Sequence, residues 1–255
     1  MKSKFVMAVF LLLLAVPSLS YGFIGFEVAV GVWHQGPGGT ISYEPVKAID
    51  EIDLENNLGY DAQSRIMGRA KVELPLILPD IYLVATPMEF DGLGRKDVDF
   101  KFGDQTFTAG TGFYSKVSLD QYDMAFAWSI PLLKTVTLKT ANVDFGLNVR
   151  MFQLSAEIAQ GAVSETTGDV TAFLPMLYVA AQLQPLDWLG IEAEVRGGVI
   201  NKSHCYDYIA RIKYYPVDLV FVAGGWHYQD LKIDEEDVEA SLTFSGPFIE
   251  AGIDF

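Results

Sequence analysis

The chain has 255 residues, of which 50% are hydrophobic, and 33 acidic against 18 basic side chains give it a formal net charge of −15. A surface this acidic excludes proteins that bind nucleic acid or other polyanions by simple charge attraction. The single cysteine, Cys205, excludes an intramolecular disulfide, so the fold must be held by other means.

The amino terminus is typical of a secretory signal peptide. Two lysines precede an apolar run over residues 5–16, and small residues follow it. We interpret residues 1–22 as this signal, with an uncleaved membrane anchor as the alternative. The signal is favoured because strand-like alternation begins at once, at Gly25.

Beyond the signal, apolar and polar residues alternate in segments of about ten residues, which is typical of strands that face lipid on one side and a polar interior on the other. A transmembrane helix is not favoured, because the nearest candidate after residue 22, the charge-free stretch 170–186, contains Pro175, Gln182 and Gln184. In chain order, the alternation predicts strands at 25–34, 63–74, 80–90, 116–130, 140–158, 171–184, 189–200, 205–215, 218–229 and 238–255.

The connections between these strands alternate in length. Those at 74–80, 131–137, 184–189 and 215–218 are short, whereas those at 35–62, 91–115 and 230–237 are long. Short periplasmic turns and longer outer loops produce this pattern in outer-membrane barrels. We therefore predict that residues 23–255 form one all-β domain, a transmembrane antiparallel up-and-down β-barrel of about ten strands, with both termini in the periplasm.

One segment leaves this count open. Residues 44–61 could extend the first hairpin or fold inward as a plug, and a twelve-strand barrel follows if outer loops also pair. In the fifth strand the apolar set changes phase at Phe152, which predicts a bulge or an exit from the bilayer.

The last strand ends on an aromatic residue after strict alternation. Ile249, Ala251, Ile253 and Phe255 share one face of this strand. We interpret Phe255 and its apolar partners as the insertion signal that the barrel-assembly machinery reads.

Placing every apolar face toward lipid turns charged side chains of both signs into the barrel interior. They are Glu27, Arg65, Arg69, Lys71, Glu73, Asp123, Asp144, Arg150, Glu192, Glu194, Arg196, Asp207, Arg211, Lys213, Glu250 and Asp254. In a barrel this narrow, opposite charges at reduced dielectric would pair and occlude the centre. A packed network of ion pairs is the favoured hypothesis, and a narrow path for ions or solutes is the alternative.

Aromatic residues gather near both predicted rims. They are Trp128, Trp188, Tyr214 and Tyr215 beside periplasmic turns, and Tyr206, Trp226 and Tyr228 near outer loops. We interpret them as aromatic girdles, although a general preference of strands for aromatic residues would also place them there. Trp33 does not fit this pattern, because alternation turns it inward.

The chain has three histidines, His34, His204 and His227, so few side chains could serve as a catalytic base near neutral pH. Ser203 and His204 are adjacent, so on a strand they point to opposite faces, and a serine hydrolase would need His34 or His227 to reach a serine across strands. No Asp-x-His spacing is present. We expect no enzyme activity, no catalytic residues and no cofactor.

The predicted outer loop at residues 230–239 is acidic, with Lys232 as its one basic residue. Clustered carboxylates could bind a divalent cation, but the glycine spacing of a calcium loop is absent, so we favour a solvated loop and no metal site. The expected partners are outer-membrane lipid and lipopolysaccharide, with no nucleic acid, and the expected state is a monomer.

Several segments carry a family resemblance. They are Gly25–Trp33 (Gly-Phe-Glu-Val-Ala-Val-Gly-Val-Trp), Gly36–Thr40, Ile52–Tyr60, Pro185–Leu189 and the terminal Phe255. Together they resemble a family of uncharacterised Gram-negative outer-membrane β-barrel proteins. The resemblance spans the mature chain and implies location and fold, without an activity. The sequence thus favours a structural or interaction barrel, with a narrow uptake porin as the alternative and a lipid-active hydrolase as the second alternative.

Overall fold

The computed structural model describes residues 24–75, 78–130, 133, 137, 140–235 and 238–255. The predicted signal peptide lies outside the described residues. The same holds for most of the predicted turn at 131–137 and for Glu236 and Asp237 of the acidic run.

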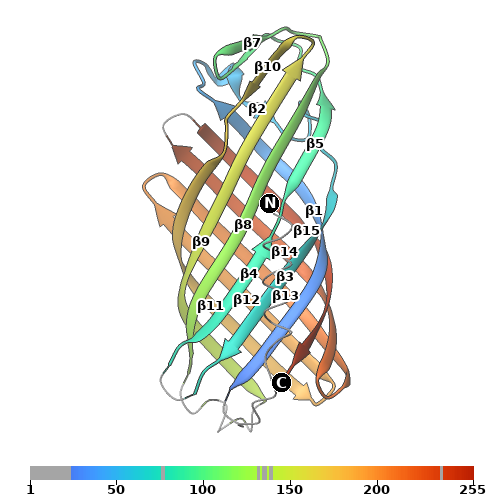
Figure 1. Ribbon diagram of the computed structural model, residues 1–255, viewed down its shortest axis with the longest axis vertical. Coiled ribbons are helices and arrows are strands. Elements are labelled where there is room, and N and C mark those ends of the chain that lie inside the picture. Colours follow the sequence, from blue (N-terminus) through green and yellow to red (C-terminus); the bar gives the residue numbers. More distant parts are fainter. Residues whose placement is uncertain (1–23, 76–77, 131–132, 134–136, 138–139, 236–237) are drawn as a thin grey trace.

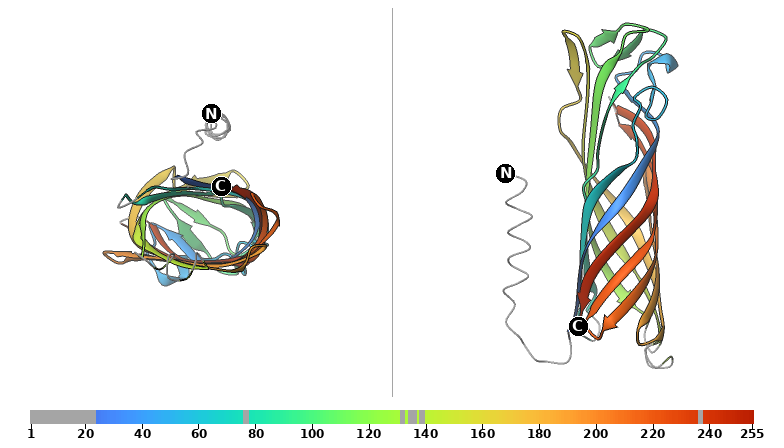
Figure 2. Two further views of the ribbon diagram at one scale, coloured as in Figure 1. Left: turned by 90° about the horizontal axis from the view of Figure 1, so that it is seen from below. Right: turned by 90° about the vertical axis from the view of Figure 1, so that its right-hand side faces the viewer.

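Within the described residues, ten antiparallel strands close a barrel (Figure 1, and seen along its length in Figure 2). In chain order they are β1 (Gly25–Tyr43), β3 (Gln63–Glu73), β4 (Asp80–Thr86), β8 (Phe113–Ser129), β9 (Ala141–Gln160), β11 (Val170–Leu186), β12 (Leu189–Ile200), β13 (Ser203–Val217), β14 (Val220–Glu235) and β15 (Val238–Asp254). Each strand pairs with the next, and β15 pairs with β1 from Glu27↔Asp254 to Tyr43↔Val238. The prediction of an antiparallel barrel of about ten strands is confirmed.

Smaller elements gather at the end of the barrel opposite the carboxyl terminus (Figure 1). They are the 3-10 turn η1 (Ala48–Asp50) and the strands β2 (Ile52–Asp53), β5 (Glu89–Gly94), β6 (Phe100–Phe102), β7 (Gln105–Phe107) and β10 (Val163–Thr166). β2 pairs with β1, β10 with β9, and β6 with β7. Over the part of the chain described, no helix has the length and apolar character to cross a membrane.

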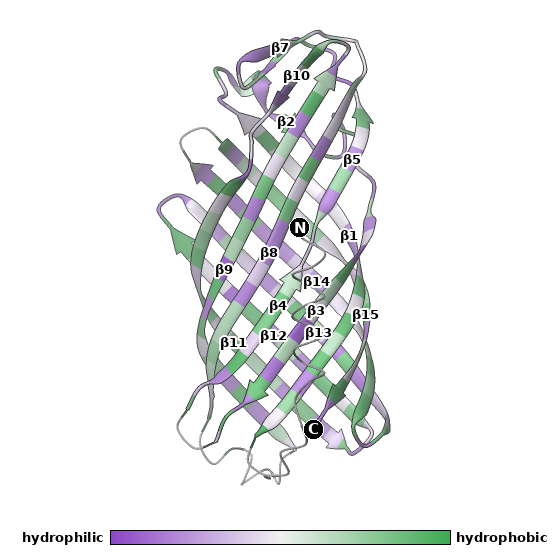
Figure 3. Ribbon diagram, in the orientation of Figure 1, coloured by the Kyte–Doolittle hydropathy of each residue, from purple (hydrophilic) through white to green (hydrophobic). Residues whose placement is uncertain are grey.

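The outside of the barrel changes character along its length. Outward side chains such as Val32, Leu147, Val195 and Ile249 are exposed and apolar over part of each strand, and the alternation of apolar and polar residues is visible in Figure 3. We call this part the belt section; it comprises residues 26–33, 66–73, 81–85, 122–129, 143–151, 173–186, 189–199, 206–217, 220–228 and 247–255. The described residues beyond it, on the side of β2, β7 and β10, form the extension.

β9 shows how one strand passes from the belt section into the extension. Its even-numbered residues, from Asn142 to Ile158, face the interior throughout, and its pairings with β8 and β11 continue without a shift in register. The predicted bulge is therefore wrong. The apolar residues change position in the sequence because the interior turns apolar at Phe152, while outward positions such as Gln153 and Glu157 turn polar.

The third predicted strand, 80–90, is wrong at its end. β4 stops at Thr86, immediately before Pro87, which has no N–H to donate to a strand ladder. The chain then resumes as β5, which pairs with β8 instead of β3. The wall of the barrel is consequently interrupted above the end of the β3–β4 pairing.

Candidate functional site: the barrel interior and its lateral seam

Charged side chains fill the interior of the belt section. The alternation of each strand turns them inward, and the following are buried: Glu27, Arg69, Lys71, Asp123, Asp144, Arg150, Glu192, Glu194, Arg196, Asp207, Arg211, Lys213 and Glu250. An isolated buried charge is costly, and good geometry with several partners offsets that cost.

Arg211 and Arg69 form the centre of this network. Arg211 lies 3.1 Å from Glu192 and 2.6 Å from Glu194, while Arg69 contacts Glu250 at 2.9 Å. Glu250 is also 3.6 Å from Arg211. Because carboxylates are shared between cations in this way, the pairs form one connected network.

A second group of contacts involves Arg150 and Arg196, and part of it links strands that are not neighbours in the sheet. Arg150 on β9 lies 2.8 Å from Asp123 on β8 and also pairs with Asp207 on β13. Arg196 lies 2.7 Å from Glu194, and its guanidinium lies over the rings of Tyr82 and Tyr178, at 5.4 and 5.2 Å from their centroids.

Contacts also cross the interior nearer the carboxyl-terminal end. Lys71 on β3 reaches Asp144 on β9 at 2.9 Å, and Lys213 on β13 reaches Glu27 on β1 at 3.0 Å. These side chains therefore reach across the interior between strands that are not neighbours in the sheet.

Sequence reasoning missed several members of this network. Asp80 is buried, accepts a hydrogen bond from the Leu74 amide at 2.9 Å, and lies 4.0 Å from Lys71. The Nε2 of His227 lies 2.9 Å from Asp207. The sequence alone could have placed His227 in the interior, because an outward Trp226 implies an inward His227 on the same strand.

Three residues that were predicted to face the barrel interior lie at the margins of that interior. Arg65 donates from Nη2 to the carbonyl oxygen of Glu89 at 2.6 Å and stands apart from the central network. The Glu73 side chain is 39% exposed although it lies 3.4 Å from Lys71. Asp254, also half-buried, accepts a hydrogen bond from the Tyr215 hydroxyl at 3.0 Å.

One of the predicted girdle residues is placed wrongly. Tyr215 faces the interior, where its hydroxyl binds Asp254 and its ring packs against Phe221 at 5.8 Å. Alternation explains this, since its neighbour Tyr214 already occupies the outer face. The other predicted girdle residues are exposed on the outside: Trp128, Trp188, Tyr206, Tyr214, Trp226 and Tyr228.

Trp33 is fully buried, as its position in the alternation predicts. It stacks on the imidazole ring of His227 with a centroid distance of 3.9 Å. Its indole N–H donates to the carbonyl oxygen of Gly246 at 3.2 Å. This aromatic pair lies between the charged network below and the apolar interior above.

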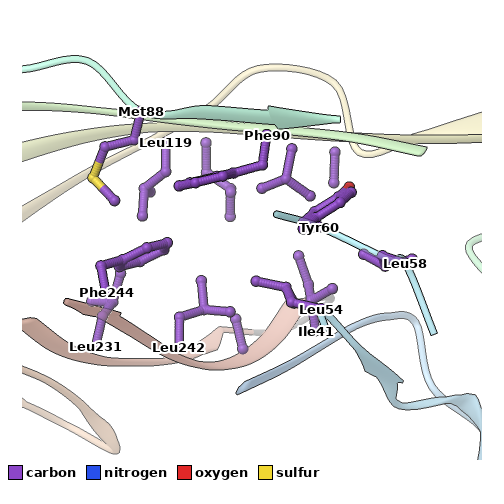
Figure 4. Packing of buried hydrophobic residues seen from close by; sticks show 14 of the residues in the cluster. Ile41, Leu54, Leu58, Tyr60, Met88, Phe90, Leu119, Leu231, Leu242 and Phe244 are labelled. Carbon is purple, nitrogen blue, oxygen red and sulfur yellow. The ribbon is translucent and has the colours of Figure 1, made fainter. Parts of the chain in front are cut away.

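The interior of the extension is packed with apolar side chains (Figure 4). Phe90 is stacked between Tyr60 at 6.2 Å and Phe244 at 5.7 Å. Leu54 and Leu58 are buried in the same cluster. Burial raises the pKa of the Tyr60 hydroxyl well above its ordinary value, which is consistent with this dry environment.

Residues 44–61, which could either extend the first hairpin or fold inward as a plug, do both in separate parts. β2 adds to the first hairpin by pairing with Thr40 and Ile41 of β1. Leu54–Tyr60 then folds inward as a plug, and the Arg95 amide donates to the Asn57 carbonyl at 2.9 Å. Gly94 permits this approach, because a Cβ there would lie 2.3 Å from the Asn57 carbonyl oxygen.

Side chains bridge the interruption in the barrel wall. The β3–β4 pairing ends at Gly68↔Ala85, and we call the gap between residues 63–67 of β3 and residues 87–94 the lateral seam. Arg65 crosses it to the Glu89 carbonyl, and the buried Gln35 donates to the Pro87 carbonyl at 3.2 Å.

A small cavity lies directly behind the lateral seam. Its volume is about 20 Å³, and its lining includes Met67, Val84, Ile209, His227 and Arg211. Over the described residues, the Nδ1 of His227 and the Nε of Arg211 are buried and have no hydrogen-bond partner. The space is about that of one water molecule.

The outer face carries one pair with nucleophilic potential. The Nδ1 of His34 lies 3.0 Å from the Ser64 hydroxyl oxygen, across the β1–β3 pairing, in an exposed position. His204 instead lies 3.4 Å from Asp230. Among the described residues, no group of three or more His, Cys, Asp or Glu side chains is arranged to hold a metal ion.

Solved structures with a similar fold include the outer membrane protease OmpT from Escherichia coli, which is 9% identical, with 94% of this chain and 99% of that chain covered and a TM-score of 0.51. Ail of Yersinia pestis is 9% identical, with 91% and 98% covered and a TM-score of 0.31. The translocator domain of the autotransporter NalP from Neisseria meningitidis is 12% identical, with 100% and 97% covered and a TM-score of 0.37. No family model and no curated protein matches the sequence. At these identities the similarity to OmpT shows the fold alone.

Proposed function

We propose that this protein is a monomeric outer-membrane β-barrel with a closed interior, which acts through its outer surface in a structural or interaction role. The observation that carries this proposal is the filling of the interior along its length. Ion pairs such as Arg150–Asp123 fill the belt section, and the apolar cluster around Phe90 fills the extension. A conducting pore needs a continuous water path, and both fillings support an interior without one.

The outer surface of the barrel supports the proposed location in the outer membrane. The exposed apolar side chains of the belt section have the chemistry that lipid requires, and Trp188 and Trp226, near its two ends, suit the membrane interfaces. The extension then stands outside the cell, facing lipopolysaccharide. Phe255 exchanges backbone hydrogen bonds with Phe26 of β1, at 2.6 and 3.0 Å, so the segment proposed for recognition by the assembly machinery also completes the barrel.

Conductance of the refolded protein in planar bilayers tests the closed interior. We expect no steady single-channel current from protein whose folding is verified by its heat-modifiable migration in gel electrophoresis. A general porin in the same bilayer gives the positive control. A steady conductance from folded protein would contradict the proposal and promote the narrow uptake channel.

One observation favours a second candidate, a lipid-ester hydrolase. His34 reaches Ser64 at 3.0 Å on the outer face, in reach for the imidazole to accept the serine proton as a general base. The hydrogen bonds of the described residues include no carboxylate that orients this imidazole. A fluorophosphonate probe tests the pair: labelling lost in Ser64→Ala and kept in Ser245→Ala supports the hydrolase, and absence of labelling of the wild type excludes it.

A further inference from the structure

On the outside of the extension, an apolar row of side chains lies beside an acidic row, across the neighbouring strands β5, β8 and β9 (Figure 1). We infer that this surface docks a cationic amphipathic polypeptide segment, whose apolar and basic side chains share one side. We call the surface the docking face; it comprises Leu93, Tyr114, Ala159, Glu89, Asp91 and Glu157. The inference rests on the proposed interaction role and names a partner for it.

The apolar row crosses three strands. The register places Leu93 of β5 opposite Tyr114 of β8, and Tyr114 opposite Ala159 of β9. Leu93 is 83% exposed, more than any other large hydrophobic side chain among the described residues, and Tyr114 is 37% exposed. Scattered single apolar side chains on a surface need no explanation. This row is continuous and lies beyond the belt section, where bilayer lipid does not cover it.

The acidic row runs parallel to the apolar row, two residues further along each strand and therefore about 7 Å away. In this row Asp91 lies opposite Lys116, and Lys116 lies opposite Glu157. Lys116 pairs with Glu89 at 2.9 Å. Within the part of the chain that the structure describes, the exposed carboxylates of Asp91 and Glu157 form no ion pair and no side-chain hydrogen bond. The row thus carries excess negative charge.

The two rows together define the chemistry of the partner. The apolar row favours an apolar side chain by burial, and the carboxylates attract lysine or arginine side chains. The ring of Tyr114 adds a face on which a cation is stabilised. Arg95, close to this surface in sequence, lies 3.6 Å from Asp97. An anionic partner is repelled, and a purely apolar one would bury carboxylates without a counter-charge.

A short peptide of matching pattern provides the probe. In an extended chain, side chains two residues apart share one side at about the spacing of the two rows. The probe has the sequence tryptophan-serine-arginine-serine-arginine and carries a neutral fluorophore. Matched peptides replace the tryptophan by serine or both arginines by glutamate. We would measure fluorescence anisotropy with the full chain in phosphatidylcholine nanodiscs, and with empty nanodiscs as the blank.

Variants of the docking face test each row separately. Leu93→Ser removes the apolar anchor and should weaken binding about tenfold. The double variant Asp91→Asn, Glu157→Gln should weaken it about fivefold, with a smaller dependence on salt. Lys116→Ala removes the one cation of the acidic row and should tighten binding about twofold. A gain in affinity is an effect that partial misfolding does not produce.

Two control variants change the same residue types outside the docking face. Ile49→Ser replaces another exposed apolar side chain, and Glu239→Gln neutralises another exposed carboxylate, on β15. Both should keep the wild-type affinity. Binding of the probe that depends on both rows and is tighter in Lys116→Ala supports the inference.

Every other outcome overturns the inference. Absence of binding, or equal affinity in all variants, shows that the docking face does not bind the probe. Affinity that depends on the carboxylates alone reduces the face to a charged surface. Dimerisation that Leu93→Ser abolishes, measured by light scattering, assigns the face to a second copy of this chain. A conducting barrel that binds the probe contradicts only the closed interior, and a closed barrel that does not bind it contradicts only this inference.

Discussion

The interior of the belt section and the interior of the extension are built from opposite chemistry in the same strands. In β9, Asp144 and Arg150 face the interior of the first, whereas Phe152 and Leu154 face the interior of the second. The alternation is unchanged between them. What changes is the exterior, which is apolar around the first region and polar around the second, so the interior of each takes the complementary chemistry.

The two fillings should respond differently to mutation. In the belt section, an ion pair contributes little net stability, but removal of one partner leaves the other buried and uncompensated. In the extension, truncation of an apolar side chain removes contacts in proportion to its size. The network should therefore be intolerant of single charge losses, and the apolar core should lose stability gradually.

The largest effect is expected from Arg196→Ala. Arg196 is buried, pairs with Glu194 at 2.7 Å and lies over two tyrosine rings, so its loss leaves Glu194 short of a partner. We expect a loss of about 3–5 kcal/mol in the free energy of unfolding, measured by urea unfolding in lipid vesicles. Lys232→Ala, on the outer face of the extension, is the control with little effect. Equal stability of the two variants would contradict a closed charge network.

A smaller effect is expected from Ala193→Arg, which tests which face of β12 meets lipid. Ala193 points outward in the belt section and Glu194 points inward. A charge on the lipid face should cost about 2–4 kcal/mol near the membrane centre, measured by the same unfolding assay and by the yield of heat-modifiable protein. Val199→Arg, near the end of the same strand, should cost less. A greater cost for Val199→Arg would place the membrane centre elsewhere.

Leu58→Ala should act on the extension alone. Leu58 is buried among the plug residues, and its truncation should cost about 2–3 kcal/mol of local stability. We expect limited proteolysis to cut within residues 44–61 sooner, while the heat-modifiable barrel survives. Ile49→Ala, at an exposed position of the same segment, is the matched control. Simultaneous loss of both regions would show that they unfold as one unit.

Much of the fold could be predicted from the sequence because strand alternation reports the face of each residue directly. The inward placement of Glu250 and the outward placement of Ile249 follow from the last strand alone. His227 could have been found by the same rule, applied to its neighbour Trp226.

The features of the fold that the sequence did not predict depend on contacts between distant segments. Pro87 is a local signal for the end of β4, but no local pattern shows that β5 then pairs with β8, or that Leu54–Tyr60 turns inward. Pairings such as Lys71–Asp144 depend on barrel register and tilt, which the alternation of one strand does not define. For the same reason the lateral seam and its cavity were not foreseen.

The smallest effect concerns Asp50, which anchors the base of the plug segment through its carboxylate. Its two oxygens accept hydrogen bonds from the amides of Val46, Lys47 and Lys101, at 2.9, 2.8 and 2.9 Å. Burial alone would raise the pKa of this carboxyl, but these bonds outweigh it and lower the pKa below its ordinary value.

The sign of the pH dependence follows from this lowered pKa. The carboxylate stabilises the segment at neutral pH, and that contribution is lost as the pH falls through the folded pKa. We expect proteolysis within residues 44–61 to accelerate on acidification in the wild type. Asp50→Asn should start about 1 kcal/mol less stable at pH 7 and show a flatter profile, because its amide cannot gain or lose this charge. Asp61→Asn, at an exposed carboxyl in the same loop, should keep the wild-type profile, and an unchanged profile in Asp50→Asn would show that other groups control the loop.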